Sequence, residues 1–186
     1  MSKESSTVKA AFDIRSMALV SLMTAVCCIL APMSVPIGPV PVSLSVLAVF
    51  FVAYVIGPRL GAISVLLYIL IGLVGLPVFS GYSGGPAKLF GPTGGYIIGY
   101  LPLVVISGWF ISRFPMRQWY LQIAGMVLGL AVCYLLGTAW FMLLMHTSLQ
   151  EALSLCVYPF LAFDALKIVT AFIVGNTVAR VTNRIR

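Results

Sequence analysis

The sequence predicts an all-α integral membrane protein with six transmembrane helices and with both termini in the cytoplasm. Hydrophobic residues make up 61% of its 186 positions and charged residues 8%, whereas a soluble domain has about 25% charged residues. Apolar runs long enough for a bilayer-spanning helix, which needs roughly 20 residues, recur along the chain. Because these runs do not alternate polar with apolar residues as barrel strands do, helices are the way to satisfy their backbone groups in lipid.

The chain leaves no room for a separate soluble domain, so residues 1–186 are expected to form one membrane-embedded domain. Proline, glycine and charged residues divide it into predicted spans at 15–31, 42–57, 60–77, 94–113, 119–145 and 160–179. The first span follows a positively charged stretch, as in a signal peptide, but it lacks a clear cleavage site and further spans follow it, so a helix is expected. The second span is short for a full crossing, and the fifth is long enough to tilt or to project from the bilayer.

The basic residues set the predicted orientation, because Lys and Arg are concentrated in cytoplasmic loops. With six spans, most of them fall on one side: Lys3, Lys9, Arg15, Arg59, Arg113, Arg117, Arg180, Arg184 and Arg186. Of the remaining two, Lys88 lies in an opposite-side loop and Lys167 lies inside a span. The net charge of +7 does not indicate a nucleic-acid binder, since the basic residues never form a stripe that could follow phosphates.

The loops differ between the two sides. The cytoplasmic turns are short, whereas the outer segments 32–41, 78–95 and 146–158 are long. Long loops tend to be functional or disordered, and these contain Val, Phe, Leu and Tyr, so we expect packed lids and a site on the outward face. Pro36, Pro39 and Pro41 make the first outer loop stiff, either as a wall over a pocket or simply as a connector.

Asp164 and Lys167 are the two charged residues that lie deep within an apolar span. They are three positions apart and therefore share a helix face. An ionisable side chain at bilayer depth costs about 2.5 to 3.5 kcal/mol even on the lowest scales and usually faces the protein interior or a cavity. One interpretation is that the two neutralise each other; the other is that they line a ligand cavity, with Asp164 accepting from ligand N–H groups and Lys167 donating to a carbonyl or carboxylate.

The segment FGPTGGY, residues 90–96, leads into the fourth span. Its glycines permit close backbone approach, and the first N–H groups of a helix can bind an anionic or carbonyl oxygen. A glycine-rich helix entry needed only for its turn explains the pattern equally well. It is not a nucleotide loop, because no G-x-x-x-x-G-K-[ST] motif is present.

Small residues four positions apart predict close helix packing at Gly95 and Gly99 and at Gly125 and Gly129. In the first span, Ala18, Ser21 and Ala25 form a similar stripe, which is a candidate docking face for another membrane protein. The four cysteines lack metal-site spacing and are expected to be buried apolar groups. Trp140 is expected to anchor or pack, or alternatively to stack on a ligand.

A catalytic site finds little support in the sequence. The chain has one histidine, His146, and no H-E-x-x-H motif, paired carboxylates or Ser-His-Asp set. We therefore expect no enzyme activity, no metal and no cofactor, and we expect that the chain cannot hydrolyse ATP by itself.

Several motifs together resemble the BioY family, the biotin-binding membrane subunits of energy-coupling factor transporters. They are PVPVSLS ending at Ser45, IGPRLGAISVLLYILIGLVGLPVFSG at 56–81, GPTGGYIIGY at 91–100 and FDALK at 163–167. The resemblance implies a cell-membrane protein with six helices that captures biotin from outside and docks on a transmembrane coupling subunit carrying two ATPases. Where the family often has glutamine after PVPVSL, this chain has Ser45, and Ser21 replaces the usual alanine of the docking stripe.

Biotin also fits the chemistry of these residues, and the intramembrane pair motivates a hypothesis about the ligand contacts. Asp164 would accept a ureido N–H of biotin, and Lys167 would donate either to the ureido oxygen or to the carboxylate. The backbone around Gly91, Thr93, Gly94 and Gly95 would bind whichever group is left, and Phe79, Tyr82, Tyr96 and Trp140 would supply apolar walls. A self-sufficient secondary transporter, in which Asp164 carries a coupling proton, is the alternative function; an intramembrane enzyme is a third.

Overall fold

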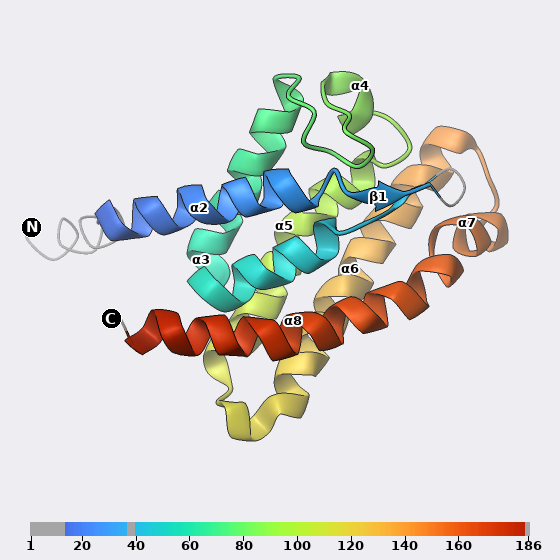
Figure 1. Ribbon diagram of the computed structural model, residues 1–186. Helices are drawn as coiled ribbons and strands as arrows, with labels where there is room; N and C mark the ends of the chain where they lie inside the picture. The colour runs from blue at the N-terminus through green and yellow to red at the C-terminus, as the bar shows by residue number, and fades with distance from the viewer. Residues whose placement is uncertain (1–13, 37–39, 185–186) are drawn as a thin grey trace, which may run out of the picture.

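The computed structural model describes residues 14–36 and 40–184, and it is dominated by helices (Figure 1). The long helices are α2 (Ile14–Leu30), α3 (Ser45–Leu73), α5 (Gly94–Arg113), α6 (Trp119–Met145) and α8 (Tyr158–Arg184). The helices predicted over 15–31, 94–113, 119–145 and 160–179 are therefore confirmed. Lys3, Lys9, Pro39 and Arg186, which entered the sequence predictions, lie outside the described residues.

The two spans predicted at 42–57 and 60–77 form one element, α3, with a kink at the predicted break. Gly57 has φ 74° and ψ −172°, a conformation that is essentially restricted to glycine. Pro58 follows it and removes a backbone donor at the same place. The chain therefore reverses within α3, as its bent course in Figure 1 shows.

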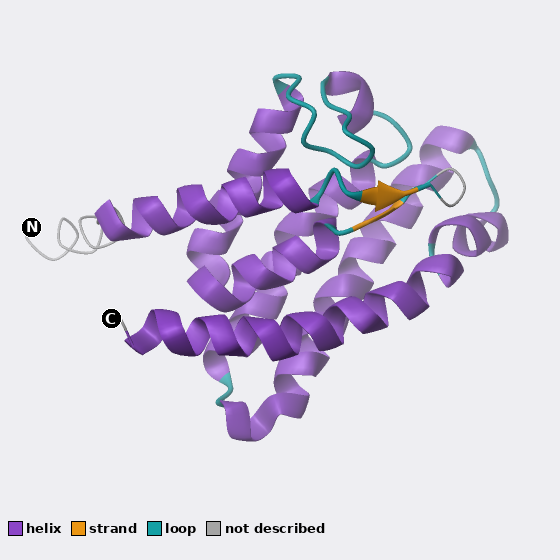
Figure 2. Ribbon diagram, viewed as in Figure 1, coloured by secondary structure: helices purple, strands orange, loops and turns teal. Residues whose placement is uncertain are grey.

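The longer connections contain short elements that the sequence did not predict. These are β1 (Ser34–Val35), β2 (Val42–Ser43), α4 (Pro86–Leu89), the 3-10 turn η1 (Met116–Gln118) and α7 (Leu149–Cys156). The two strands pair antiparallel, with Ser34 opposite Ser43. Figure 2 shows the strands and most of the loops gathered at one end of the helices, whereas the start of α2 and the end of α8 lie at the other.

Four helices in the described residues are long and apolar enough to cross a bilayer: Ser45–Leu73, Gly94–Arg113, Met116–Met145 and Tyr158–Gly175. Helix α2, with 17 residues, is apolar but shorter. Length and composition thus support a membrane protein in which several helices span the bilayer.

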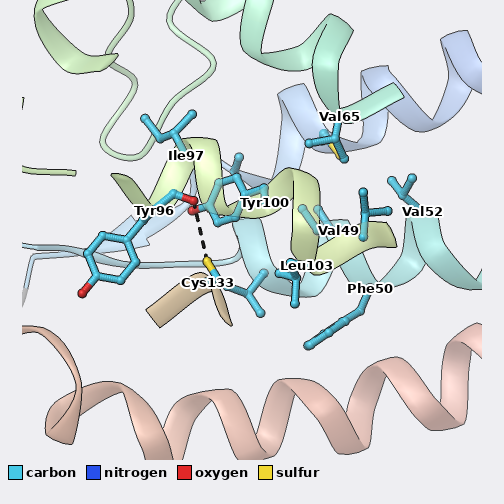
Figure 3. Close-up of a cluster of buried hydrophobic side chains, with 14 of the residues drawn as sticks. Val49, Phe50, Val52, Val65, Tyr96, Ile97, Tyr100, Leu103 and Cys133 are labelled. Carbon is cyan, nitrogen blue, oxygen red and sulfur yellow. Dashed lines mark hydrogen bonds between the residues drawn. The ribbon is translucent and has the colours of Figure 1, made fainter. Parts of the chain in front are cut away.

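Helix α5 packs between α3 and α6 and forms the centre of the core. Figure 3 shows its residues Tyr96, Tyr100 and Leu103 among the buried apolar side chains of α3 and α6, and the Cys133 thiol donates to the Tyr96 carbonyl at 3.7 Å. Gly99 meets α6 so closely that an added Cβ would lie 2.9 Å from the Cys133 sulfur. The close helix packing predicted from the spaced glycines is therefore confirmed between α5 and α6.

Candidate functional site

A cavity lies between the β2 strand and the facing sides of α3, α5, α6 and α8. Aromatic and aliphatic side chains dominate its wall, with a small number of polar groups among them, which is the usual make-up of a small-molecule site. The lining residues are Val40, Pro41, Ser43, Ser45, Val46, Tyr68, Ser80, Thr93, Tyr96, Ile97, Tyr100, Leu130, Cys133, Tyr134, Phe160 and Asp164. Residues from widely separated parts of the sequence therefore meet at one chamber.

Asp164 and Lys167 form an ion pair in the interior of the protein. The Lys167 Nζ donates to Asp164 Oδ1 at 2.6 Å, and the two residues are 7% and 2% exposed, respectively. Because α8 places them three positions apart, both reach the same side of the helix. Asp164 lines the cavity, whereas Lys167 is not among the lining residues and binds the Asp164 carboxylate. A buried pair that borders a chamber can exchange part of its internal bonding for a ligand with matching donors and acceptors.

Tyr134 is the main polar residue of the cavity wall that sequence reasoning missed. Its hydroxyl, from α6, donates to Asp164 Oδ2, the oxygen that Lys167 does not bind. Nothing in the run CYLLG marks this tyrosine, because a tyrosine in an apolar helix is usually a packing residue. The bond connects α6 with α8. It depends on the packing of these two helices and cannot be predicted from either segment alone.

Hydroxyl groups supply the other polar atoms of the wall. Ser43 Oγ and Ser45 Oγ lie 2.8 Å apart and hydrogen-bond to each other. The Thr93 side chain is 7% exposed, and its Oγ1 has no hydrogen-bond partner among the described residues. Since buried polar groups are nearly always paired, a free hydroxyl at the cavity wall is a marked exception.

Thr93 precedes the first turn of α5, and its side chain makes no capping bond to that turn. Gly94 and Gly95, which open the helix, lie under the Trp140 side chain: an added Cβ on Gly95 would sit 2.4 Å from the Trp140 Cβ. The Trp140 Nε1 donates to the Gly91 carbonyl at 3.0 Å. Trp140 thus packs against the entry to α5 and holds it in place, and it is not among the lining residues of the cavity.

Three of the predicted site residues line the cavity directly, and the others support it or lie apart. Asp164, Thr93 and Tyr96 are in the wall. Phe79 is fully buried and packs edge to face on Tyr68, with ring centroids 5.6 Å apart. Tyr82 is 69% exposed and has φ 54°. Neither of these two rings belongs to the lining, so their contact with a ligand stays a prediction.

The comparisons with known proteins agree with this architecture. The model of the BioY family matches residues 2–184. The chain belongs to the BioY family. Among its relatives, the probable biotin transporter BioY of Pyrococcus horikoshii is 40% identical over 88% of this chain and 98% of its own length. The biotin transporter BioY of Thermotoga maritima is 37% identical over 87% of this chain and 94% of its own length.

A solved structure is also similar to this chain. The crystal structure of the S-component for biotin from an ECF-type ABC transporter superposes with a TM-score of 0.78 at 27% identity and covers 91% of this chain and 92% of that one. Membership in BioY together with the long apolar helices makes this chain a multi-pass membrane protein.

The predicted docking stripe of this BioY chain lies on α2. Ala18, Ser21 and Ala25 are all exposed, whereas Val20, Met23 and Thr24 turn inward. Thr24 Oγ1 hydrogen-bonds to the Val20 carbonyl at 2.8 Å and reaches Ser64 of α3, with 3.1 Å between the hydroxyl oxygens. The inward face fixes α2 against α3, so the small residues are left on the outside.

Proposed function

We propose that this protein is the biotin-binding subunit of an ATP-driven vitamin uptake transporter, capturing biotin from the extracellular side. The observation that carries the proposal is the buried Asp164–Lys167 pair, whose Asp164 lines a cavity between the helices. The relatives named biotin transporters, and the S-component for biotin that shares the fold, support biotin as the ligand.

Biotin matches the polar groups of this chamber. Its ureido ring offers N–H donors beside a carbonyl, its fused rings are apolar, and its tail ends in a carboxylate. Asp164 accepts a ureido N–H, and Lys167 donates to the ureido oxygen or to the carboxylate. The Thr93 hydroxyl, which has no partner in the described part of the chain, binds the remaining group together with the α5 entry at Gly91, Gly94 and Gly95. Tyr96 supplies an apolar wall, and from outside the lining Phe79 supports Tyr68 and Trp140 supports the α5 entry.

We also propose six membrane crossings with both termini in the cytoplasm. The two arms of α3 on either side of Gly57 count as separate crossings, and α2 makes another. The end of the molecule that carries Arg59 and Arg113 is then cytoplasmic, as the positive-inside rule requires. The strands, α4 and α7 gather at the opposite end (Figure 1), which faces outward.

Energy for uptake comes from separate subunits in this proposal. The sequence has no phosphate-binding loop, so the protein acts as a non-enzymatic binding subunit. It docks through the exposed stripe of Ala18, Ser21 and Ala25 on a transmembrane coupling protein that carries two ATPases, because small residues let helices approach closely in lipid.

Ligand binding to the purified protein in detergent tests the site. Wild type and Lys167→Ala are each titrated with biotin and with its uncharged tail amide. If Lys167 binds the carboxylate, amidation of the tail weakens binding to wild type and has little further effect on Lys167→Ala. An equal loss of affinity on amidation in both proteins rules that contact out. Lys88→Ala is the matched control, since Lys88 lies in α4 and not in the cavity wall. Absence of biotin binding by folded wild type overturns the proposal.

Uptake into liposomes separates the proposed function from a self-sufficient transporter. The protein alone should bind biotin without accumulating it, whether or not a proton gradient is imposed. Co-reconstitution with the coupling subunit and its ATPases should give ATP-dependent uptake. Accumulation driven by a proton gradient without those subunits would instead favour Asp164 as a proton carrier.

A further inference from the structure

The Asp164 carboxylate is held from two sides by donors of the protein itself. Lys167 binds Oδ1 along α8, and the Tyr134 hydroxyl binds Oδ2 from α6. A carboxylate oxygen has two lone pairs. Each oxygen of Asp164 therefore keeps one acceptor position when both internal bonds are made, and Asp164 and Tyr134 both face the cavity.

The Tyr134 ring is itself fixed by its neighbours. It packs edge to face on Tyr96, with ring centroids 6.5 Å apart and an interplanar angle of 79°. The Tyr96 hydroxyl is in turn 3.3 Å from Thr138 Oγ1 and donates to the Cys156 carbonyl at 3.4 Å. The Tyr96 ring also fills the space beside Gly137, where an added Cβ would lie 2.4 Å from it. This packing restricts Tyr134 to a position from which its hydroxyl meets Asp164.

The orientation of the carboxylate depends on this second bond. With Lys167 alone, the Asp164 plane is free to turn and to present both oxygens to the ammonium. A donor on Oδ2 fixes the plane and keeps that oxygen away from Lys167. Because the phenol has a single proton and donates it to Asp164, its oxygen has only acceptor positions left for the cavity. Asp164 and Tyr134 together therefore present an edge of acceptors that selects for N–H groups.

We propose that Tyr134 is a positioning residue that sets the selectivity of the site for ureido N–H donors by holding Asp164 in its acceptor orientation. This inference rests on the proposed function, in which Asp164 accepts a ureido N–H. It adds Tyr134 of α6 to the polar recognition groups proposed on α8 and at the entry to α5.

The test compares Tyr134→Phe with wild type, using biotin and three analogues. In two of them one or the other ureido N–H is replaced by oxygen, which removes a donor and keeps the ring shape. The third is the tail amide. We expect wild type to bind biotin far more tightly than the oxygen analogue that lacks the N–H facing Asp164. In Tyr134→Phe the ratio of these two affinities should fall about tenfold, because one hydrogen bond that sets the selectivity is lost. The preference over the tail amide should stay unchanged.

A merely structural role for Tyr134 predicts a different result. The affinities for biotin and for the oxygen analogues would then fall in parallel, their ratio would not change, and the inference would be overturned. Tyr120→Phe is the matched control, because Tyr120 lies in the same helix, is exposed and is outside the cavity. If Tyr134→Phe does not give folded protein, 4-fluorophenylalanine at position 134 fills the space of the hydroxyl without a donor, and the same ratio decides. Failure of wild type to bind biotin would overturn the proposed function, whereas an unchanged ratio in a variant that binds biotin would overturn this inference alone.

Discussion

Replacing Thr93 by valine should stabilise the empty protein and weaken its binding of biotin. The Thr93 hydroxyl is buried at the cavity wall and has no hydrogen-bond partner among the described residues. Valine has nearly the same shape and removes the hydroxyl. The substitution therefore removes the cost of an unpaired polar group in the empty protein, and in the complex it removes the bond that the hydroxyl makes to the ligand.

Both effects have an expected size. A buried unsatisfied group costs about 1–3 kcal/mol, and in a chain of this length each kcal/mol shifts the melting temperature by about 2–4 °C. Thr93→Val should therefore raise the Tm by several degrees in the absence of ligand. A hydrogen bond to a neutral ligand group contributes about 0.5–1.5 kcal/mol and one to a carboxylate about 1.5–3. With a tenfold change per 1.4 kcal/mol, the Kd for biotin should rise by about twofold to a hundredfold.

Thermal unfolding in detergent and biotin titration measure the two effects on the same samples. Ser107→Ala is the matched control, because Ser107 Oγ is also buried and unpartnered in the described chain but lies outside the cavity wall. It should share the stabilisation and leave the Kd unchanged. The reasoning is refuted if Thr93→Val lowers the ligand-free Tm, or if its affinity for biotin equals that of wild type.

Further substitutions test the ion pair and the backbone. Lys167→Met should lower the free energy of unfolding by about 3 kcal/mol because it leaves Asp164 without its cation. Adding Asp164→Leu should recover much of that loss. A double variant less stable than Lys167→Met would contradict the pairing. Gly57→Ala should cost about 1–3 kcal/mol, since φ 74° suits glycine, and an unchanged Tm would count against that strain. Gly137→Ala places a methyl group 2.4 Å from the Tyr96 ring and should lower the free energy of unfolding by about 1–3 kcal/mol. It should also weaken biotin binding, and unaltered binding would mean that Tyr96 does not shape the site.

Much of the helical framework could be predicted from the sequence. Spans 94–113 and 119–145 coincide with α5 and α6, because apolar runs bounded by glycine, proline and charge define helices in lipid. The kink at Gly57 was also visible, since Gly-Pro both permits and enforces a break. The strands, α4 and α7 were not predicted, because short elements in loops depend on tertiary contacts more than on periodicity.

The site was predictable only where a residue was anomalous in its own segment. Asp164 and Lys167 are ionisable groups in an apolar run, so their pairing could be predicted, and the structure confirms it. Tyr68, Tyr100 and Tyr134 carry no such signal, because a tyrosine is ordinary in an apolar helix. Trp140 packs on the α5 entry, as expected of such a ring, and its alternative role of stacking on a ligand stays a prediction because it does not line the cavity.

By itself the sequence determined that this chain belongs in a membrane, where the central helices α5 and α6 begin and end, and that one acidic and one basic side chain need each other inside it. These properties follow from local composition and spacing, because lipid requires apolar side chains and internally bonded backbone wherever the chain runs. The tertiary structure alone decided which side chains share the chamber. How the helices pack brings Tyr134 of α6 to Asp164 of α8 and leaves the Thr93 hydroxyl at the wall without a partner from residues 14–36 or 40–184. That packing is a sum of many close contacts that no single segment specifies.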